Sequence, residues 1–313
     1  MRIQQYPLKT GITRTPEVEK KRLATHACNC GTACGHGCLY CSVRASLRMH
    51  PSFKACDENP FQFGYAITDP STPERVARDA KRIRKRGMIQ LCSVTDAWAP
   101  EAHEYQVGRR CLHAILLESH WTVRILTKNA ALVDDFGYIK QFRDRVILAQ
   151  SVTGTPDRNE VIEIIEPHAS GIMERMSAMR LASAMGLRTY AMFCPLLPGI
   201  ADSPEQIDQL VQFAVECNAE EIFVEPVNPR GSGLRLSQEA LELWGYTEEA
   251  KAIQRIRNMP GWSQYTTDLA KNAQRAVRKY SDIAKLRFLL YPKRLLDEDK
   301  ATIMADDEGI IWL

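Results

Sequence analysis

The sequence predicts an α/β protein built on a partial (β/α)6 barrel of parallel strands. From about residue 88, short apolar runs alternate with longer amphipathic stretches, which is the pattern of repeated βα units. With a short strand before Cys28, six strands are expected, too few to close an eight-stranded, TIM-like barrel but enough for a partial one. The other five expected strands cover residues 88–93, 122–126, 146–150, 187–193 and 221–224.

Helix boundaries can also be predicted. The Ser-Thr-Pro-Glu sequence at 71–74 has the form of a capping box, and Gly87 is the expected end of that helix. Residues 203–206 repeat the device, and a third helix is expected from about 171 to 185, ending at Gly186.

The alternation of strands and helices fades after about residue 233. Helices are expected over 236–258 and 269–280, before an apolar run at 288–291. We therefore divide the chain into an N-terminal segment (1–24), a barrel core (25–233) and a mainly helical C-terminal extension (234–313).

Composition restricts the class of protein. The 313 residues are 45% hydrophobic and 25% charged, as in soluble globular proteins, and the net charge of +3 does not by itself indicate a nucleic-acid binder. The first residues lack the apolar stretch of a signal peptide, and no run is long enough to span a membrane, so we expect a cytoplasmic protein with no membrane partner. Ten cysteines, five of them between Cys28 and Cys41, then indicate metal rather than disulfides.

Three of these cysteines have the spacing of an iron-sulfur site. Cys34, Cys38 and Cys41 lie in a glycine-rich loop, and three thiolates leave one iron of a 4Fe-4S cluster without a protein ligand. Zinc is the alternative, although its cysteines usually come as two separated pairs and no second pair follows. Cys28 and Cys30 remain as further ligands in that case.

The motif resembles the signature of the radical S-adenosylmethionine (radical SAM) superfamily, in which an aromatic residue, here Tyr40, precedes the third cysteine. Three further stretches, 93–96, 125–128 and 165–167 followed by Arg175, resemble the branch related to spore photoproduct lyase, and the resemblance extends over about 25–229. It implies a partial barrel of the radical SAM type. It also implies an enzyme that cleaves S-adenosylmethionine reductively to a 5'-deoxyadenosyl radical, which abstracts hydrogen from a substrate. Electrons would come from an external donor such as a flavodoxin or ferredoxin.

The resemblance assigns roles to residues at the strand ends. Tyr40 corresponds to an aromatic near the adenine, or is a buried tyrosine that shapes the loop. Thr95 and Asp96 correspond to groups facing the amino group of the cofactor, with a helix cap as the alternative for Asp96. Lys128 corresponds to a lysine that binds its carboxylate, or is a solvated lysine, and Ser151 to a serine that contacts its ribose.

Three more residues belong to the predicted site. Glu166 and Arg175 match the family pattern but could simply pair with each other. Cys92 lies one residue out of step with the hydrogen-donating cysteine of the spore lyase, and a one-residue offset turns a strand side chain to the opposite face. Cys92 is therefore either a catalytic hydrogen donor or a buried structural thiol.

The substrate is left open. Basic residues at 75–86, and Lys271, Arg275, Arg278 and Lys279, would suit a nucleic-acid lesion or a nucleotide, unless they form ordinary solvated helix faces. The alternatives are modification of a peptide or partner protein, and a non-catalytic zinc or iron-sulfur binding module.

Overall fold

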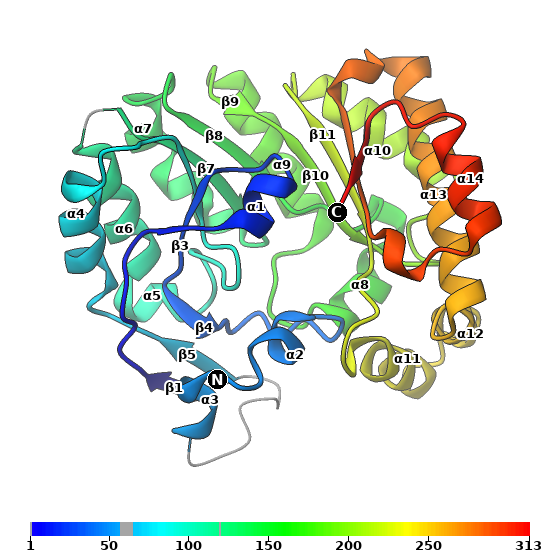
Figure 1. The fold of residues 1–313 in the computed structure, drawn as a ribbon, viewed down its shortest axis with the longest axis horizontal. Coiled ribbons are helices and arrows are strands. Elements are labelled where there is room, and N and C mark those ends of the chain that lie inside the picture. Colours follow the sequence, from blue (N-terminus) through cyan, green and yellow to red (C-terminus); the bar gives the residue numbers. More distant parts are fainter. Residues whose placement is uncertain (1, 57–64, 119) are drawn as a thin grey trace.

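A computed structural model describes residues 2–56, 65–118 and 120–313 of the chain. Its centre is a curved run of parallel strands with helices on the outside (Figure 1). One sheet has the order β2-β3-β6-β7-β8-β9, a second has the order β10-β11-β12-β13, and a parallel bridge between Ser151 and Met192 connects them. The strands are β2 (Thr13–Arg14), β3 (His26–Cys28), β6 (Met88–Leu91), β7 (Thr122–Thr127), β8 (Val146–Gln150), β9 (Arg188–Thr189), β10 (Ala191–Leu196), β11 (Ile222–Pro226), β12 (Leu286–Leu290) and β13 (Ile310–Trp312).

The predicted α/β class with parallel strands is confirmed, and the C-terminal segment adds to it. β12 pairs in parallel with β11, and β13 pairs in parallel with β12. The predicted boundary at residue 233 falls where α11 begins, and sheet pairing continues beyond it. The sequence conceals this continuation because three helices separate β11 from β12.

Helices flank the strands, and most lie on the outer face, whereas α1 packs against the inner face. They are α1 (Pro16–Lys20), α2 (Val43–Leu47), α3 (Pro51–Lys54), α4 (Thr72–Arg82), α5 (Ala102–Tyr105), α6 (Val107–Leu116), α7 (Phe136–Lys140), α8 (Asn159–Ile165), α9 (Ile172–Ala184), α10 (Pro204–Glu216), α11 (Gly233–Leu243), α12 (Thr247–Arg255), α13 (Met259–Tyr280) and α14 (Asp297–Met304). Short 3-10 turns are η1 (Ala130–Asp135), η2 (Pro156–Arg158), η3 (Ile283–Lys285) and η4 (Pro292–Arg294). Within the described residues, no helix is both long and apolar enough to cross a membrane.

Some predicted helix boundaries need correction. The capping box at Ser203 forms, with Ser203 Oγ accepting from the Gln206 amide at 3.2 Å. Ser71 does not cap α4, because its hydroxyl donates to Asp69 instead (2.7 Å), and α4 ends at Arg82 rather than at Gly87. The helix predicted over 236–258 is two helices, separated at Gly245, whose φ of +83° suits glycine.

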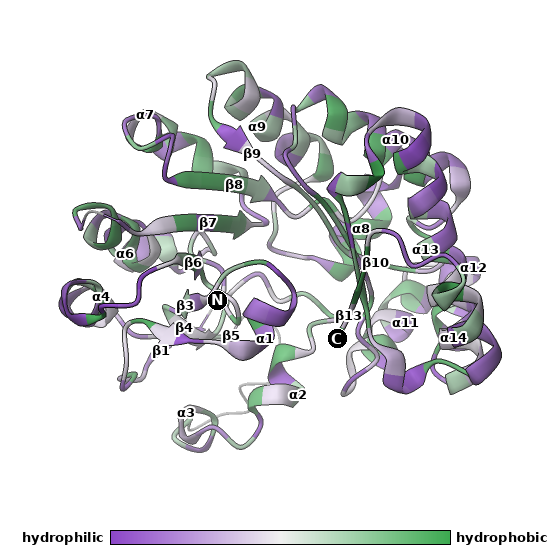
Figure 2. Ribbon diagram, turned by 45° about the horizontal axis from the view of Figure 1, so that its top comes forward, coloured by the Kyte–Doolittle hydropathy of each residue, from purple (hydrophilic) through white to green (hydrophobic). Residues whose placement is uncertain are grey.

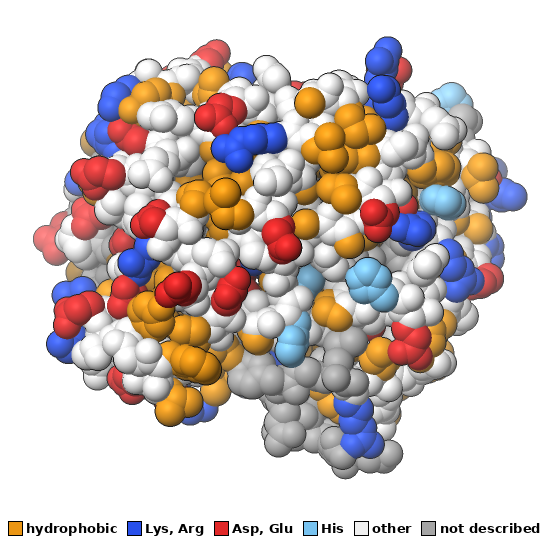
Figure 3. All heavy atoms as spheres, turned by 180° about the vertical axis from the view of Figure 1, so that it is seen from behind, with side chains coloured by type: hydrophobic (Ala, Val, Ile, Leu, Met, Phe, Trp, Pro, Cys, Tyr) orange, Lys and Arg blue, Asp and Glu red, His pale blue; other side chains and the backbone are white. Residues whose placement is uncertain are grey.

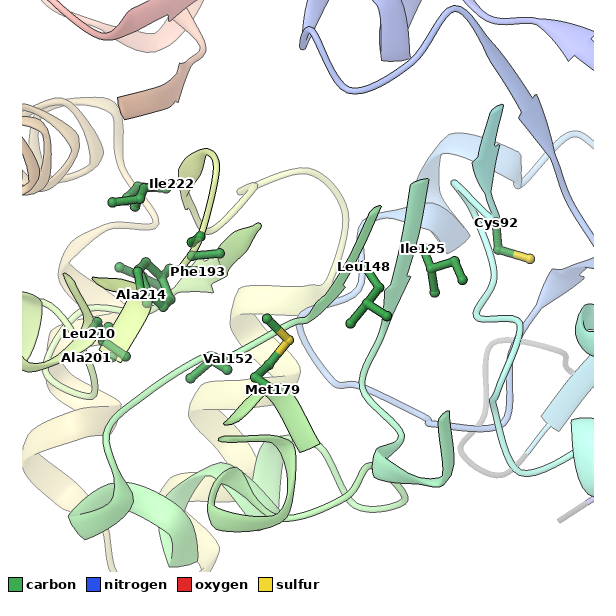
Figure 4. Packing of buried hydrophobic residues seen from close by; sticks show 14 of the residues in the cluster. Cys92, Ile125, Leu148, Val152, Met179, Phe193, Ala201, Leu210, Ala214 and Ile222 are labelled. Atoms are coloured by element: carbon green, nitrogen blue, oxygen red, sulfur yellow. The ribbon is translucent and has the colours of Figure 1, made fainter. Parts of the chain in front are cut away.

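The core around the parallel strands has two parts, one on each face. The larger part lies between strands and helices, and Figure 4 draws Leu148 of β8 and Met179 of α9 among its members. The smaller part fills the inside of the partial barrel with residues such as Met192 and Phe223, against Val18 and Leu23 of the α1 region. Strands apolar on both faces are expected in a parallel sheet, and in Figure 2 the central strands are largely green whereas the outer helices mix green and purple.

A separate small sheet supports the cysteine loop. It has the order β1-β5-β4, with β1 at Arg2–Gln5, β5 at Tyr65–Thr68 and β4 at Gly31–Ala33. A Cβ atom at Gly31 would lie 2.0 Å from the Ile67 carbonyl oxygen, so this approach of β4 to β5 requires glycine. Cys34 follows β4 directly, and the sheet therefore determines where the loop begins.

Candidate functional site

The loop from Cys34 to Cys41 lies at the carboxyl ends of the parallel strands, where such folds place their chemistry. All three cysteine thiols are partly buried. Burial and the Glu101 carboxylate raise the pKa of Cys34, and the neighbouring Cys38 and Cys41 add to this effect. Iron ions bound here would offset the repulsion between the thiolates and the Glu101 carboxylate. Because thiolates are the ligands that iron-sulfur clusters require, the three cysteines fit such a cluster. In the described part of the chain, no three His, Cys, Asp or Glu side chains converge on a single metal ion.

His36 attaches the loop to the strand ends. Its Nε2 lies 3.0 Å from Asp96 Oδ2, and its Nδ1 lies 3.0 Å from the His168 carbonyl oxygen. Asp96 also accepts hydrogen bonds from Thr127 Oγ1 (2.7 Å), the Lys128 amide (2.8 Å) and the Trp98 amide (2.8 Å). Burial lowers the pKa of His36, but Asp96 outweighs burial and raises it overall. His36 therefore positions the loop, with both ring nitrogens engaged in contacts within the protein.

Asp96 lies between the cysteine loop and the end of β7, and its predicted contact with the amino group of the cofactor stays a prediction. Its hydrogen bonds go to the cysteine loop and to the end of β7, and the amide of Trp98 is the local backbone group that it caps. It does not cap α5, whose first turn receives no side-chain cap. The structure brings Asp96 to the predicted site as the carboxylate that joins loop and strand.

Tyr40 attaches the other side of the loop to a buried ion pair. Its hydroxyl donates to Glu166 Oε1, and Glu166 Oε2 accepts from Arg175 Nη2. The side chains of Glu166 and Arg175 are 0% and 1% exposed. Burial alone would raise the pKa of Glu166, but Arg175 and Lys128 lower it overall. The pairing considered for Glu166 and Arg175 is confirmed, and Tyr40 has the buried, loop-shaping contacts of its alternative interpretation.

Lys128 and Thr95 have polar groups with few partners among the described residues. Lys128 Nζ lies 3.5 Å from the Cys194 carbonyl oxygen and 5.8 Å from the centre of the Tyr40 ring. Burial opposes charge on this lysine, but Glu166 and Cys38 raise its pKa overall. Thr95 Oγ1 is buried with no described partner, beside a cavity of about 10 Å³ that also contacts Glu101. The Lys128 ammonium is thus the group best able to accept a new anionic partner here.

The row of strand-end side chains continues beyond those predicted. Thr127 of β7 pairs with Gln150 of β8, so the next residues, Lys128 and Ser151, lie beside each other. Phe193 of β10 pairs with Val224 of β11, so Cys194 and Glu225 lie beside each other in the same way. Ser151 Oγ donates to the Cys194 carbonyl at 2.5 Å, and Cys194 Sγ donates to Glu225 Oε2 at 3.1 Å.

Glu225 is the residue that sequence reasoning missed. It is buried, and besides Cys194 it accepts from Lys21 Nζ (2.7 Å) and from the Tyr291 hydroxyl. A charged residue at the end of an apolar strand was the available signal, but its partners are up to 204 residues away in sequence. Cys194, which looks like a small core residue in the sequence, belongs to this interior group.

Cys92 faces the helices rather than the barrel mouth. Its thiol lies 3.5 Å from Cys30 Sγ and belongs to the cluster that includes Cys28 and Cys111 of α6. Figure 4 draws Cys92 with Ile125 and Leu148 of that same cluster, on neighbouring strands. The hydrogen bond to Cys30 and burial raise the pKa of the thiol. This placement is that of a buried structural thiol, and a hydrogen-donor role for Cys92 stays a prediction without geometric support.

The basic run at 75–86 lies away from the cysteine loop. It ends just before β6 begins, which is at the amino ends of the parallel strands. Four of its members pair with acids: Arg75 with Asp69, Arg78 and Arg82 with Asp79, and Lys81 with Glu118.

The basic residues of α13 are mostly neutralised as well. Arg275 and Lys279 pair with Asp208, and Arg278 pairs with Asp306 and Glu308. The face in Figure 3 likewise shows basic side chains interspersed with acidic ones. Neither basic segment therefore supports a nucleic-acid surface at the candidate site.

Comparison with curated proteins finds distant relatives. No protein-family model matches the chain. An uncharacterized protein of Acidianus two-tailed virus is 21% identical over 239 residues, which are 75% of this chain and 78% of the viral protein. An uncharacterized protein of Mycobacterium tuberculosis is 27% identical over 205 residues, 64% of this chain and 57% of that protein.

Comparison with solved structures finds the fold. Spore photoproduct lyase complexed with dinucleoside spore photoproduct superposes with a TM-score of 0.59 at 14% identity, over 89% of this chain and 79% of that chain. A mutant of the lyase with bound AdoMet and dinucleoside spore photoproduct gives 0.57 at 13% identity, over 89% and 78% of the two chains. The chain thus shares the fold of spore photoproduct lyase.

Proposed function

We propose that the protein is a radical SAM enzyme in which Cys34, Cys38 and Cys41 bind a 4Fe-4S cluster and S-adenosylmethionine binds the open iron. When bound, this pair supplies a 5'-deoxyadenosyl radical that abstracts hydrogen from a substrate. The observation that carries the proposal is the attachment of the three-cysteine loop to the strand ends. The bonds of His36 to Asp96 and of Tyr40 to Glu166 make that attachment.

Other residues of the chain would bind and orient the cofactor. The Lys128 ammonium is partly buried and has a single long contact among described residues, so it suits the carboxylate of S-adenosylmethionine. Thr95 would face its amino group. Asp96 would face the same amino group, Ser151 would contact the ribose, and Tyr40 would pack beside the adenine.

The buried pair of Glu166 and Arg175 would act indirectly. Arg175 donates to the Ser151 carbonyl (2.9 Å) and the Ser170 carbonyl (2.6 Å), so it joins the end of β8 to the turn before α9. Through the Tyr40 hydroxyl, Glu166 extends this support to the loop beside Cys41. Both are positioning residues in the proposal.

The proposal includes partners. Reductive cleavage requires an external one-electron donor, for which a flavodoxin or ferredoxin is suitable. A nucleic-acid lesion or nucleotide is the proposed substrate, because the superposed lyase structure holds a dinucleoside photoproduct. Modification of a peptide or partner protein remains the rival reaction.

Anaerobic reconstitution tests the proposal. After addition of iron and sulfide, about four irons per chain and reductant-dependent formation of 5'-deoxyadenosine are expected. Cys34→Ala, Cys38→Ala and Cys41→Ala should each abolish cleavage, whereas Cys28→Ala and Cys30→Ala serve as matched controls and should retain it. A colourless protein with one tightly bound zinc, or a Cys41→Ala variant that still cleaves, would contradict the proposal.

A further inference from the structure

A second polar site lies beside the cysteine loop, in a cavity of about 350 Å³. Its lining residues come from the turn after β11, the start of α11 and the turn between α12 and α13: Pro229, Gly231, Ser232, Leu234, Arg235 and Arg257. A volume of this size is within the range of small-molecule sites. None of the residues assigned to the cofactor belongs to this lining, so the cavity is a separate site.

The lining is positively charged. Arg235 and Arg257 are both exposed, and no Asp or Glu occurs among the described lining residues. Arg235 Nη1 pairs with Glu239 at 2.7 Å on the surface of α11. Arg257 Nη1 contacts the neutral Gln238 Oε1 at 3.0 Å, so its charge has no acidic partner in that contact. Guanidinium groups beside a polar cavity suit phosphate, because their planar donors match its oxygens.

The cavity adjoins the loop that holds the cluster. A Cβ atom at Gly233 would lie 2.7 Å from the Tyr40 carbonyl oxygen, so the start of α11 packs directly on the loop backbone. A Cβ atom at Gly231 would lie 2.7 Å from the Cβ of Ala45, just after the third cysteine. Arg230 Nη1 also reaches Ser46 Oγ at 3.4 Å. In Figure 1, α11 and α2 are neighbours at the same end of the molecule.

We propose that Arg235 and Arg257 form a phosphate-binding subsite that anchors a nucleotide-type substrate next to the cysteine loop. This inference rests on the proposed function for its substrate, and it replaces the basic run at 75–86 as the basic element that contacts phosphate. The shared chemistry is a phosphate group, which could belong to the phosphodiester of an oligonucleotide or to the phosphomonoester of a mononucleotide. Either would be held from one side while the reacting carbon faces the barrel mouth.

The test compares two basic pairs at opposite ends of the barrel. The variant Arg235→Gln/Arg257→Gln removes two charges from the cavity, and the control Arg84→Gln/Lys85→Gln removes two exposed charges before β6. Reconstituted, unreduced protein is titrated with a fluorescent thymidine decanucleotide at several salt concentrations. Competition by thymidine monophosphate and by inorganic phosphate distinguishes the two phosphate sources.

The cavity variant should bind the decanucleotide at least about tenfold more weakly than the wild type. The slope of log affinity against log salt concentration should become shallower by about 1 for each phosphate contact that is lost. The control should bind like the wild type. Competition by the monophosphate would identify a mononucleotide site, and its absence would identify an oligonucleotide site. Since both cavity arginines are exposed, the melting temperatures of the two double variants should agree. The single variants Arg257→Gln and Arg84→Gln repeat the comparison with one charge removed from each.

Two results would overturn the inference: equal affinity of the cavity and control variants, or no binding of any of the three probes by the wild type. Substrate-independent formation of 5'-deoxyadenosine is measured on the same preparations and should be unchanged in both variants. If cleavage is absent from the wild type while the cavity variant loses binding, the proposed function fails and the phosphate site stands.

Discussion

Replacing Arg175 with methionine should strongly destabilise the protein. The Arg175 side chain is 1% exposed and its partner Glu166 is 0% exposed, so the substitution leaves a carboxylate buried without its guanidinium. Removing one member of a buried ion pair typically costs about 3–5 kcal/mol. The Ser151 and Ser170 carbonyls also lose a donor in this variant. We expect a loss in the free energy of unfolding of about that size.

The matched control is an exposed pair. Arg180 and Glu216 bond at 3.1 Å, but their side chains are 48% and 56% exposed, so Arg180→Met should cost about 1 kcal/mol or less. Both variants are unfolded with urea as cluster-free protein. The double variant Glu166→Gln/Arg175→Met should lose less than the sum of the two single variants, because neither charge is then left buried alone.

Lowering the pH should reproduce part of the loss in the free energy of unfolding that is expected for Arg175→Met. Burial raises the pKa of Glu166, but Arg175 and Lys128 lower it overall below its ordinary 4.5. A lowered pKa in the folded state gives stability that is present above pH 4.5 and is lost as the pH falls through the folded-state value. Glu166→Gln should lack this loss. The reasoning is refuted if Arg175→Met and Arg180→Met differ by less than about 1 kcal/mol.

Three further outcomes are expected. Lys128→Ala should weaken S-adenosylmethionine binding about tenfold to a hundredfold, measured by calorimetry, without loss of iron. Lys140→Ala, at an exposed lysine, is the control. An unchanged dissociation constant for Lys128→Ala would mean that Lys128 has only a structural role. Cys92→Ala should give wild-type products in the proposed reaction, since its thiol faces Cys30, and aberrant products would restore the hydrogen-donor role. Burial raises the pKa of Glu101 from 4.5 to about 7, so the folded state binds this proton more tightly than the unfolded state does. The resulting stabilisation of the folded state is complete below pH 4.5 and is lost as the pH rises through about 7. At 1.36 kcal/mol per pKa unit, the difference between these two pKa values corresponds to about 3 kcal/mol in the free energy of unfolding. Glu101→Gln should abolish this pH dependence of urea unfolding. A variant with the wild-type pH profile would contradict the reasoning.

The sequence predicts the parts of the site that depend on short-range pattern. Lys128 and Ser151 were expected at strand ends, and β7 and β8 do end at Thr127 and Gln150. Such predictions succeed because strand ends in a parallel sheet share one edge, so a residue's position along its own strand determines its level.

Contacts between distant segments could not be predicted in this way. The bond from Lys21 to Glu225 joins residues 204 apart, and no local pattern encodes it. The direction of Cys92 depends on its backbone, whose φ of +61° is unusual for a residue other than glycine. The break at Gly245 between α11 and α12, and the strands β12 and β13, were missed because helix-rich sequence surrounds them.

The pairing of β12 with β11, and of β13 with β12, affects how the chain folds during synthesis. Residues 310–312 form a strand of the same sheet, and the Leu313 amide donates to the Leu290 carbonyl at 3.0 Å. Until β12 leaves the ribosome, β11 presents an unpaired edge whose backbone groups can pair with another nascent chain. Ribosome-bound chains that end before residue 286 should therefore depend on chaperones more than the finished protein does.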